Sequence, residues 1–287
     1  MSDKKILENI KKLREITGVG FSDCKLAITE TNGDIEKSIE YLRKKGIAKA
    51  SKKMSRVAAD GLILVNEKDG NISIIEINSE TDFVAKNKDF ISFCKEISNL
   101  NFINKADLDK LNKSKMKNDK TVEENLITLI SKIGEKITIR RGKYFDNNGK
   151  NFFYVHNSSE KNIGKVISIV KLSSDNKKNL DEVGNKLAMH VAAQAPIAIN
   201  DNGISKSILD KELEIIKEEL KNSGKKSEMI EKIANGKIKK FISENTLLNQ
   251  TWIMDTKISV SSFLKQYSND GEIKVIDFVR FKVGEGI

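Results

Sequence analysis

The chain has 287 residues, 38% of them hydrophobic and 32% charged, and this length allows two or three packed units. Its longest apolar runs, such as Val166–Val170, are only as long as strands, so we expect no membrane span, and the first residues lack the apolar core of a secretory leader. The two cysteines, Cys24 and Cys94, lie far apart in no metal-binding or disulfide pattern, which is typical of the cytoplasm.

The formal net charge of +10 raises nucleic acid as a partner. However, only 6 of the 51 basic residues are Arg, whose planar fork dominates specific contacts with bases and phosphates. Lys alternates with acidic residues in segments such as 211–221, which is typical of a solvated helix face. We therefore expect that no direct contact with nucleic acid is required. A basic RNA-associated binding protein remains the alternative.

Three short helices are predicted between residues 6 and 45. The first has apolar residues at helical spacing and ends near Gly20, and the third begins after Asn32-Gly33-Asp34. A bundle of this size is marginal alone and usually serves as a docking module. The Lys- and Ala-rich residues 47–56 that follow are interpreted as a basic linker, which is compatible with a helix.

Alternating residues predict a β-hairpin followed by a helix in two places. Residues 62–66 and 72–78 alternate about a turn that ends at Gly70, and an apolar helix face from Phe90 to Ile97 follows. The same order recurs with strands at 152–155 and 164–172 and a helix at 180–191. We therefore predict two related hairpin-plus-helix subdomains.

Residues 206–244 carry a narrow apolar stripe on an otherwise charged helical pattern, which is interrupted near Asn222-Ser223-Gly224. This pattern favours a protruding antiparallel helical hairpin. Two ordinary packed helices are the alternative.

The sequence contains few residues in a pattern that could support catalysis. His156 and His190 are the only histidines, and neither stands at ligand spacing from a cysteine or from the other histidine. The segment Gly224-Lys225-Lys226-Ser227 lacks the upstream glycine and strand of a phosphate-binding loop. We expect no catalytic residue, no metal site and no cofactor. A hydrolase that uses His156 or His190 is the minority alternative.

The most informative segment is 76–87, Glu-Ile-Asn-Ser-Glu-Thr-Asp-Phe-Val-Ala-Lys-Asn. On its residues alone it is an ordinary helix start, in which Thr81 or Asp82 caps the helix and Phe83 and Val84 fill the core. The segment also resembles, almost residue for residue, the signature of the bacterial elongation factor Ts family. Similar stretches follow in the family's order along the chain: 13–21 with Asp23, Cys24 and Lys25, then Ile133-Gly134-Glu135, Arg140-Arg141, 189–193, 239–241 and 281–286.

The resemblance implies an α+β fold. Its expected parts are a bundle like the ubiquitin-associated (UBA) domain over 1–46, the basic linker over 47–56, a core N-subdomain over 57–140 and a core C-subdomain over 141–287 with the helical hairpin at about 206–244. The resemblance also implies a non-enzymatic guanine-nucleotide exchange factor. Its expected partner is elongation factor Tu, in the GDP-bound and the nucleotide-free form, from which it would promote release of GDP so that GTP can bind.

The family's contact positions are carried over onto matching residues of this chain. A wedge that intrudes near the Mg²⁺ held by Tu corresponds to Thr81, Asp82, Phe83 and Val84. Contacts with the G domain of Tu correspond to Arg14, Val19, Phe21 and Lys25. Contacts with other parts of Tu correspond to Ile133, Gly134, His156, Ile253 and Met254.

Two departures from the family pattern bear on these contacts. Gln250-Thr251-Trp252 stands where the family usually has Gln-Pro-Phe, next to the expected Ile253–Met254 contact. Family members commonly continue beyond the position of Ile287 into a helix that touches the G domain, so we expect this contact to be missing or supplied otherwise.

Overall fold

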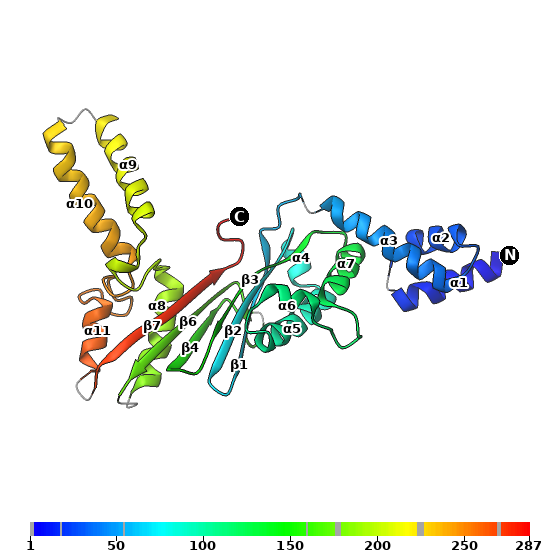
Figure 1. The fold of residues 1–287 in the computed structure, drawn as a ribbon, viewed down its shortest axis with the longest axis horizontal. Coiled ribbons are helices and arrows are strands. Elements are labelled where there is room, and N and C mark those ends of the chain that lie inside the picture. Colours follow the sequence, from blue (N-terminus) through cyan, green and yellow to red (C-terminus); the bar gives the residue numbers. More distant parts are fainter. Residues whose placement is uncertain are drawn as a thin grey trace.

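The computed structural model describes residues 3–17, 19–53, 55–158, 160–175, 179–222, 227–268 and 271–287. Within these residues the molecule is elongated, with a helical bundle at one end, antiparallel sheets in the middle and a pair of long helices projecting at the other end (Figure 1). The predicted α+β class is confirmed, including the N-terminal helices and the helical hairpin.

The N-terminal bundle consists of α1 (Asp3–Thr17), α2 (Phe21–Glu30) and α3 (Ile35–Lys53). Their apolar faces meet in a small core that includes Ile10, Leu13, Cys24, Ala27 and Ile28. Asp34 starts α3, because its Oδ1 accepts the backbone N–H of Lys37 at 3.0 Å. The predicted linker 47–56 is helical as far as Lys53, as a continuation of α3. Met54 lies outside the described residues.

A four-stranded sheet forms the first half of the core, in the order β3-β2-β1-β5 within the described part of the chain. Its strands are β1 (Asp60–Lys68), β2 (Asn71–Ser79), β3 (Ile137–Phe145) and β5 (Ile163–Gly164). The helices of this half are α4 (Asp82–Ala85), α5 (Lys88–Ile103), α6 (Leu108–Lys113) and α7 (Val122–Ile133). The predicted hairpin is the β1–β2 pair, in which Leu62 lies opposite Ile77.

The second half of the core is a sheet in the order β4-β6-β7, again among the described residues. It comprises β4 (Lys150–His156), β6 (Val166–Ser174) and β7 (Ile273–Lys282). The helix α8 (Leu180–Gln194) packs on it, and α11 (Val260–Gln266) shares their apolar core. A short 3₁₀ turn (Asp201–Gly203) leads into the helical hairpin of α9 (Lys206–Asn222) and α10 (Ser227–Asn245).

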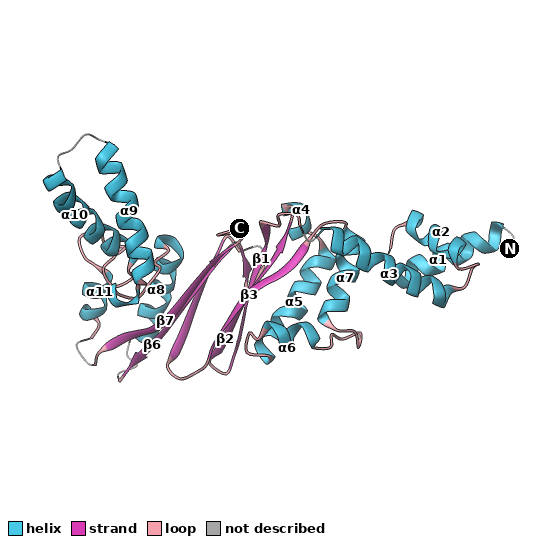
Figure 2. Ribbon diagram, turned by 45° about the horizontal axis from the view of Figure 1, so that its top comes forward, coloured by secondary structure: helices cyan, strands magenta, loops and turns pink. Residues whose placement is uncertain are grey.

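The two sheets pack against each other, because β1 and β2 are apolar on both faces. Leu62, Leu64, Ile75 and Ile77 belong to the core beneath α5 and α7. The alternate residues Ile63, Val65, Ile72 and Ile74 pack against Ile167, Ile169 and Phe281 of the other sheet. The two packed sheets therefore form the middle of the core, between the helices α4–α7 on one side and α8 on the other (Figure 2).

The predicted boundary between residues 140 and 141 falls inside β3 and needs correction. β3 pairs with β2 from Ser79↔Ile137 to Ile72↔Phe145, so this strand belongs to the first sheet over its whole length. The sequence analysis predicted no strand here, because Arg140-Arg141-Gly142-Lys143 interrupts the alternation of apolar residues. The remaining domain boundaries stay predictions.

No helix among the described residues is long and apolar enough to cross a membrane.

Candidate partner-binding site

The turn after β2 presents a phenylalanine ring to solvent. Phe83 is 78% exposed, whereas its neighbours Val84 and Ala85 are 5% and 6% exposed and belong to the core beneath α5. The four-residue helix α4 is thus packed against the core on one side and exposed to solvent on the other. The expectation that both Phe83 and Val84 fill the core is wrong for Phe83. The residues expected to form a wedge therefore divide into an exposed ring and a buried anchor.

Thr81 occupies the N-cap position of α4, but its side chain makes no capping bond there. Its hydroxyl donates instead to Glu135 Oε1 at 2.9 Å, and its backbone N–H donates to Glu135 Oε2 at 3.0 Å. Glu135 directly follows Gly134, which ends α7 in the left-handed conformation with φ 88°. The structure therefore brings the expected contact residues Ile133 and Gly134 beside the turn that carries Phe83.

Asp82 is exposed and forms an ion pair with Lys86 one helical turn later, with 2.7 Å between Oδ2 and Nζ. The hydrogen bond from Lys86 lowers the pKa of the Asp82 carboxyl below its ordinary value. Asp82 therefore carries a negative charge beside the Phe83 ring at neutral pH.

The expected contacts on the bundle differ in their exposure. Arg14 and Lys25 are exposed and Phe21 is 44% exposed, but Val19 is 8% exposed and lies in the core of the bundle. Val19 therefore packs beneath this surface and contributes little exposed area to it. The bundle also exposes apolar side chains that the sequence analysis did not select, namely Leu7, Ile16 and Leu26.

The remaining expected contacts lie in the second half of the core. His156 is exposed at the end of β4, with Nδ1 at 3.3 Å from the Tyr154 hydroxyl. Met254 is 47% exposed in the loop before α11. The adjacent Ile253 donates its backbone N–H to Nδ1 of the buried His190 at 3.4 Å. His156 at the end of β4 and Met254 before α11 belong to other elements than Phe83 in α4, so the expected contacts come from different parts of the fold.

His190 is buried and in contact with other side chains of the core. Its Nε2 lies 3.0 Å from Gln250 Oε1, and its ring stacks on Trp252 at 5.1 Å between centroids. Burial lowers the pKa of His190, and the hydrogen bond to Gln250 opposes this shift. A neutral ring that donates to Gln250 and accepts from Ile253 satisfies both nitrogens within the protein. His190 therefore holds the Ile253–Met254 loop in place.

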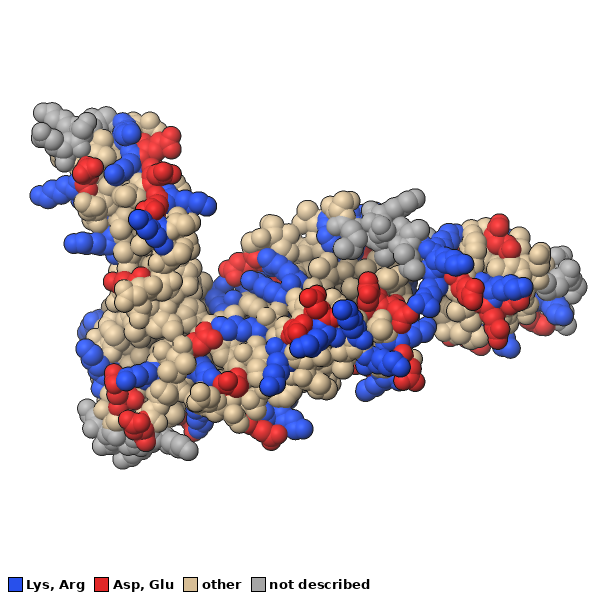
Figure 3. Space-filling model, viewed as in Figure 1, with Lys and Arg blue, Asp and Glu red and all other residues tan. Residues whose placement is uncertain are grey.

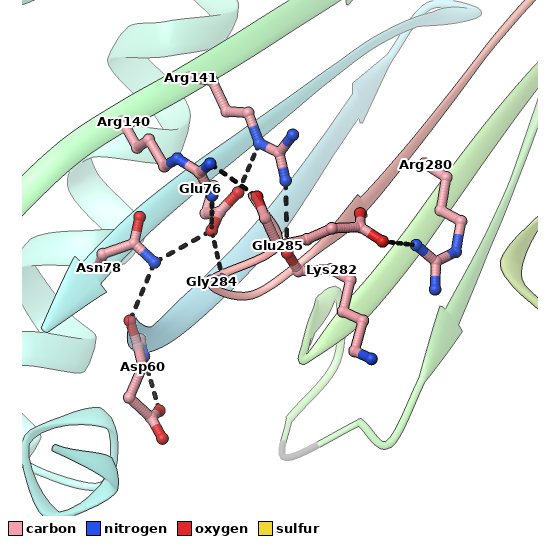
Figure 4. A network of polar contacts seen from close by, with 10 residues as sticks. Asp60, Glu76, Asn78, Arg140, Arg141, Arg280, Lys282, Gly284 and Glu285 are labelled. Carbon is pink, nitrogen blue, oxygen red and sulfur yellow. Dashed lines mark hydrogen bonds and ion pairs between the residues drawn. The ribbon is translucent and has the colours of Figure 1, made fainter. Parts of the chain in front are cut away.

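A buried carboxylate joins the middle of β2 to the C-terminal turn (Figure 4). Glu76 is 0% exposed and accepts from Asn78 Nδ2, Arg140 Nη1, Arg141 Nε and the backbone N–H of Gly284, at distances between 2.6 and 3.1 Å. Burial alone would raise the pKa of Glu76, but these donors, Gly284 first, lower it below its ordinary value. Glu76 is therefore ionised and fully bonded.

The network continues toward α8. Arg140 donates to the carbonyl oxygen of Glu285, and Arg280 pairs with the Glu285 carboxylate at 2.7 Å (Figure 4). Arg280 also donates from Nε to the carbonyl oxygen of Ala192 in α8 at 2.9 Å. The sequence pattern did not predict this network. The available signal was a single Glu inside the apolar run 74–77 together with two adjacent arginines.

Basic and acidic side chains are interspersed over the face seen in Figure 3. Many of them pair, as Lys95 does with Glu160 and Lys237 with Glu219. In the described ranges, no group of three or more His, Cys, Asp or Glu side chains is placed to hold a metal ion.

Comparison with known proteins gives a consistent result. Residues 80–285 match the family model described as elongation factor TS. The chain is 40% identical to elongation factor Ts of Rickettsia felis over 283 residues, which covers 97% of this chain and 91% of the relative. Elongation factor Ts of Rickettsia prowazekii is 42% identical over 284 residues, with the same coverage. That of Rickettsia bellii is 39% identical over 284 residues, covering 97% and 92%.

Proposed function

Because this chain belongs to the elongation factor Ts family and is a translation elongation factor, we propose that it is a guanine-nucleotide exchange factor for elongation factor Tu in the cytoplasm. It docks onto GDP-bound Tu and promotes release of GDP. The nucleotide-free complex that remains can then bind GTP. It forms no covalent intermediate, needs no cofactor and requires no contact with nucleic acid. The interspersed charges on the face seen in Figure 3 support this last point.

The exposed Phe83 is the observation that carries the proposal. An apolar ring with 78% of its surface in solvent, on a helix anchored by Val84 and Ala85, is suited to insertion into a partner. A G protein holds GDP partly through a Mg²⁺ ion that neutralises the phosphate charge. Insertion of Phe83 with the charged Asp82 beside it displaces the elements of Tu that position this ion. The diphosphate is then bound less tightly.

The free energies involved require a wide interface around the wedge. A thousandfold faster release corresponds to about 4 kcal/mol of barrier. Burial of one phenylalanine provides only about 1.5–3 kcal/mol. Docking elsewhere must supply the rest, over an interface of roughly 1,000 Å² or more. The bundle with Phe21 and Lys25 and the loop with Met254 provide exposed patches for this docking.

The test is the release of a fluorescent GDP analogue from purified Tu in the presence of excess unlabelled GDP. We expect the rate to rise with the concentration of this protein and to saturate. Linkage adds a second expectation, since GDP must weaken the binding of this protein by the same factor by which this protein weakens the binding of GDP. Release at the intrinsic rate at all concentrations would overturn the proposal.

A further inference from the structure

The ladder between β2 and β3 is continued by side chains beyond its last backbone pair. That pair is Ser79↔Ile137. One residue further along, the backbone N–H of Lys136 donates to Glu80 Oε1 at 2.6 Å. In the opposite direction, the backbone N–H of Thr81 donates to Glu135 Oε2 at 3.0 Å. Each carboxylate thus accepts the amide that follows the other glutamate in the chain.

Both carboxylates have further bonds that fix them. Glu135 uses its second oxygen to accept the Thr81 hydroxyl at 2.9 Å, so that it holds Thr81 at two points. Glu80 pairs with Arg56, whose Nη1 lies 3.2 Å from Glu80 Oε2. Hydrogen bonds to an ionised acceptor are shorter and stronger than those between neutral groups. Two loops that are 54 residues apart in the sequence are therefore joined by reciprocal charge-assisted bonds.

The segment held by these bonds, Glu80-Thr81, leads directly into the helix α4 that carries Phe83. Two residues, Glu80 and Thr81, connect the end of β2 to α4, and α4 is too short to be stable by itself. Val84 and Ala85 fix the far side of α4 in the core. The near side is fixed at Thr81, where the hydroxyl that would ordinarily cap the helix donates to Glu135 instead.

We propose that Glu80 and Glu135 are positioning residues for nucleotide exchange, which hold the Thr81–Phe83 turn in the orientation that lets the Phe83 ring enter the partner. This inference rests on the proposed exchange function. Neither carboxylate needs to touch Tu or its nucleotide. Their contribution is that the ring enters without a prior ordering step, because an element that is already ordered loses less entropy on binding.

The decisive variants are Glu135→Ala and Glu135→Gln, with Glu182→Gln as the matched control. Gln at 135 keeps one oxygen acceptor, so it can preserve one of the two bonds to Thr81. Glu182 forms an exposed ion pair with Lys186 on α8, away from the turn. Amide hydrogen exchange at Thr81 and Lys136 measures the bonds themselves and needs no Tu. Titration of Tu then separates the affinity from the maximal rate of GDP release.

We expect the Thr81 amide to be protected in the unaltered protein and to lose most of this protection in Glu135→Ala, with a partial loss in Glu135→Gln. The maximal rate of GDP release should fall by about tenfold or more in Glu135→Ala, since small misplacements of a reacting element are costly. Glu135→Gln should recover part of this rate. The dissociation constant for Tu should change less than about threefold, since the candidate docking patches on the bundle and on the Met254 loop are left intact. Glu182→Gln should match the unaltered protein.

Three results would overturn the inference. One is an unprotected Thr81 amide in the unaltered protein, and another is a normal maximal rate in a Glu135→Ala protein that has lost this protection. A third is loss of affinity with an unchanged maximal rate, which would make Glu135 a docking residue. A failure of the proposed function is recognised separately, because the unaltered protein itself would then leave GDP release at its intrinsic rate. If Glu135→Ala does not fold, the Glu135→Gln and Thr81→Val variants each remove a part of the same bonds.

Discussion

At the scale of single residues, the two histidines have opposite environments. His156 is exposed at the end of a strand, whereas His190 is fully buried between Gln250 and Trp252. The ring of His190 accepts from the Ile253 backbone, so its neutral form stabilises the loop that exposes Met254. Protonation would remove this acceptor and place a charge in the core.

The burial of His190 predicts a pH dependence of stability. Burial lowers its pKa in the folded protein below the ordinary value of about 6.5. As the pH falls from about 6.5 toward the lowered folded value, the unfolded chain binds more protons than the folded protein, so the free energy of unfolding decreases. Urea unfolding at pH 7.5 and pH 5.5 measures this change. The decrease should persist in His156→Gln and be largely absent in His190→Gln; equal decreases in both variants would contradict the assignment to His190.

At the scale of elements, β2 is the strand on which the network and the wedge both depend. Glu76 ties its middle to β3 and to the turn at Gly284, and the strand ends immediately before the Phe83 turn. Gly284 has φ +75°, and a Cβ there would overlap the carbonyl of Ala59. The close approach of this turn to the start of β1 therefore requires glycine.

Removing the charge of Glu76 should destabilise the protein strongly. In Glu76→Gln the shape is kept, but the carboxylate charge is lost and only one oxygen acceptor remains for Arg140 and Arg141; breaking a buried ion pair costs about 3–5 kcal/mol. The arginines are 22% and 31% exposed, which favours the lower end of this range. Urea unfolding at pH 7 checks the value. Glu272→Gln, which removes only an exposed pair with Lys274, should leave the free energy of unfolding nearly unchanged.

The same network predicts part of the acid denaturation. Because the folded-state pKa of Glu76 is lowered, its stabilisation is present above the unfolded pKa of about 4.3 and is lost as the pH falls through the folded value. Glu76→Gln should therefore show a smaller loss of stability between about pH 5 and pH 3. An unchanged loss of stability in this variant would show that Glu76 is not the titrating group.

Elements with regular periodicity could be predicted from the sequence, and those stabilised by distant polar groups could not. The apolar residues Leu62, Leu64, Ile72 and Ile74 predicted β1 and β2, and because both strands are buried on both faces these residues belong to near-continuous apolar runs. β3 was missed because Arg140 and Arg141 bind a carboxylate on a neighbouring strand, which local patterns do not reveal. The exposure of Phe83 was not predicted from its residues either, since the preceding Thr81 is held by Glu135, which lies 54 residues further along the chain. Only the family resemblance indicated a wedge there.

At the scale of the whole molecule, the packed sheets separate the candidate docking patches. The bundle lies at one end, the loop with Met254 belongs to the other half of the core, and the Phe83 turn lies between them (Figure 1). The two sheets are joined across their contact by the ion pairs Glu76–Arg140 and Glu285–Arg280, which the hydrogen bond from Arg140 to the carbonyl oxygen of Glu285 connects (Figure 4). An elongated, braced scaffold of this kind can hold a partner at several points while the wedge acts in the middle.

The most direct test of this account compares two exposed apolar residues. Phe83→Ala removes the proposed wedge, and Ile103→Ala removes a side chain that is 71% exposed at the far end of α5, about 22 Å from the start of that helix. The measurement is the maximal rate at which GDP leaves Tu at saturating concentrations of each variant. Phe83→Ala should still bind Tu but release GDP about ten- to a hundredfold more slowly than the unaltered protein, which matches the burial energy of one phenylalanine. Ile103→Ala should leave the rate unchanged. A Phe83→Ala protein that releases GDP as fast as the Ile103→Ala protein would contradict the account.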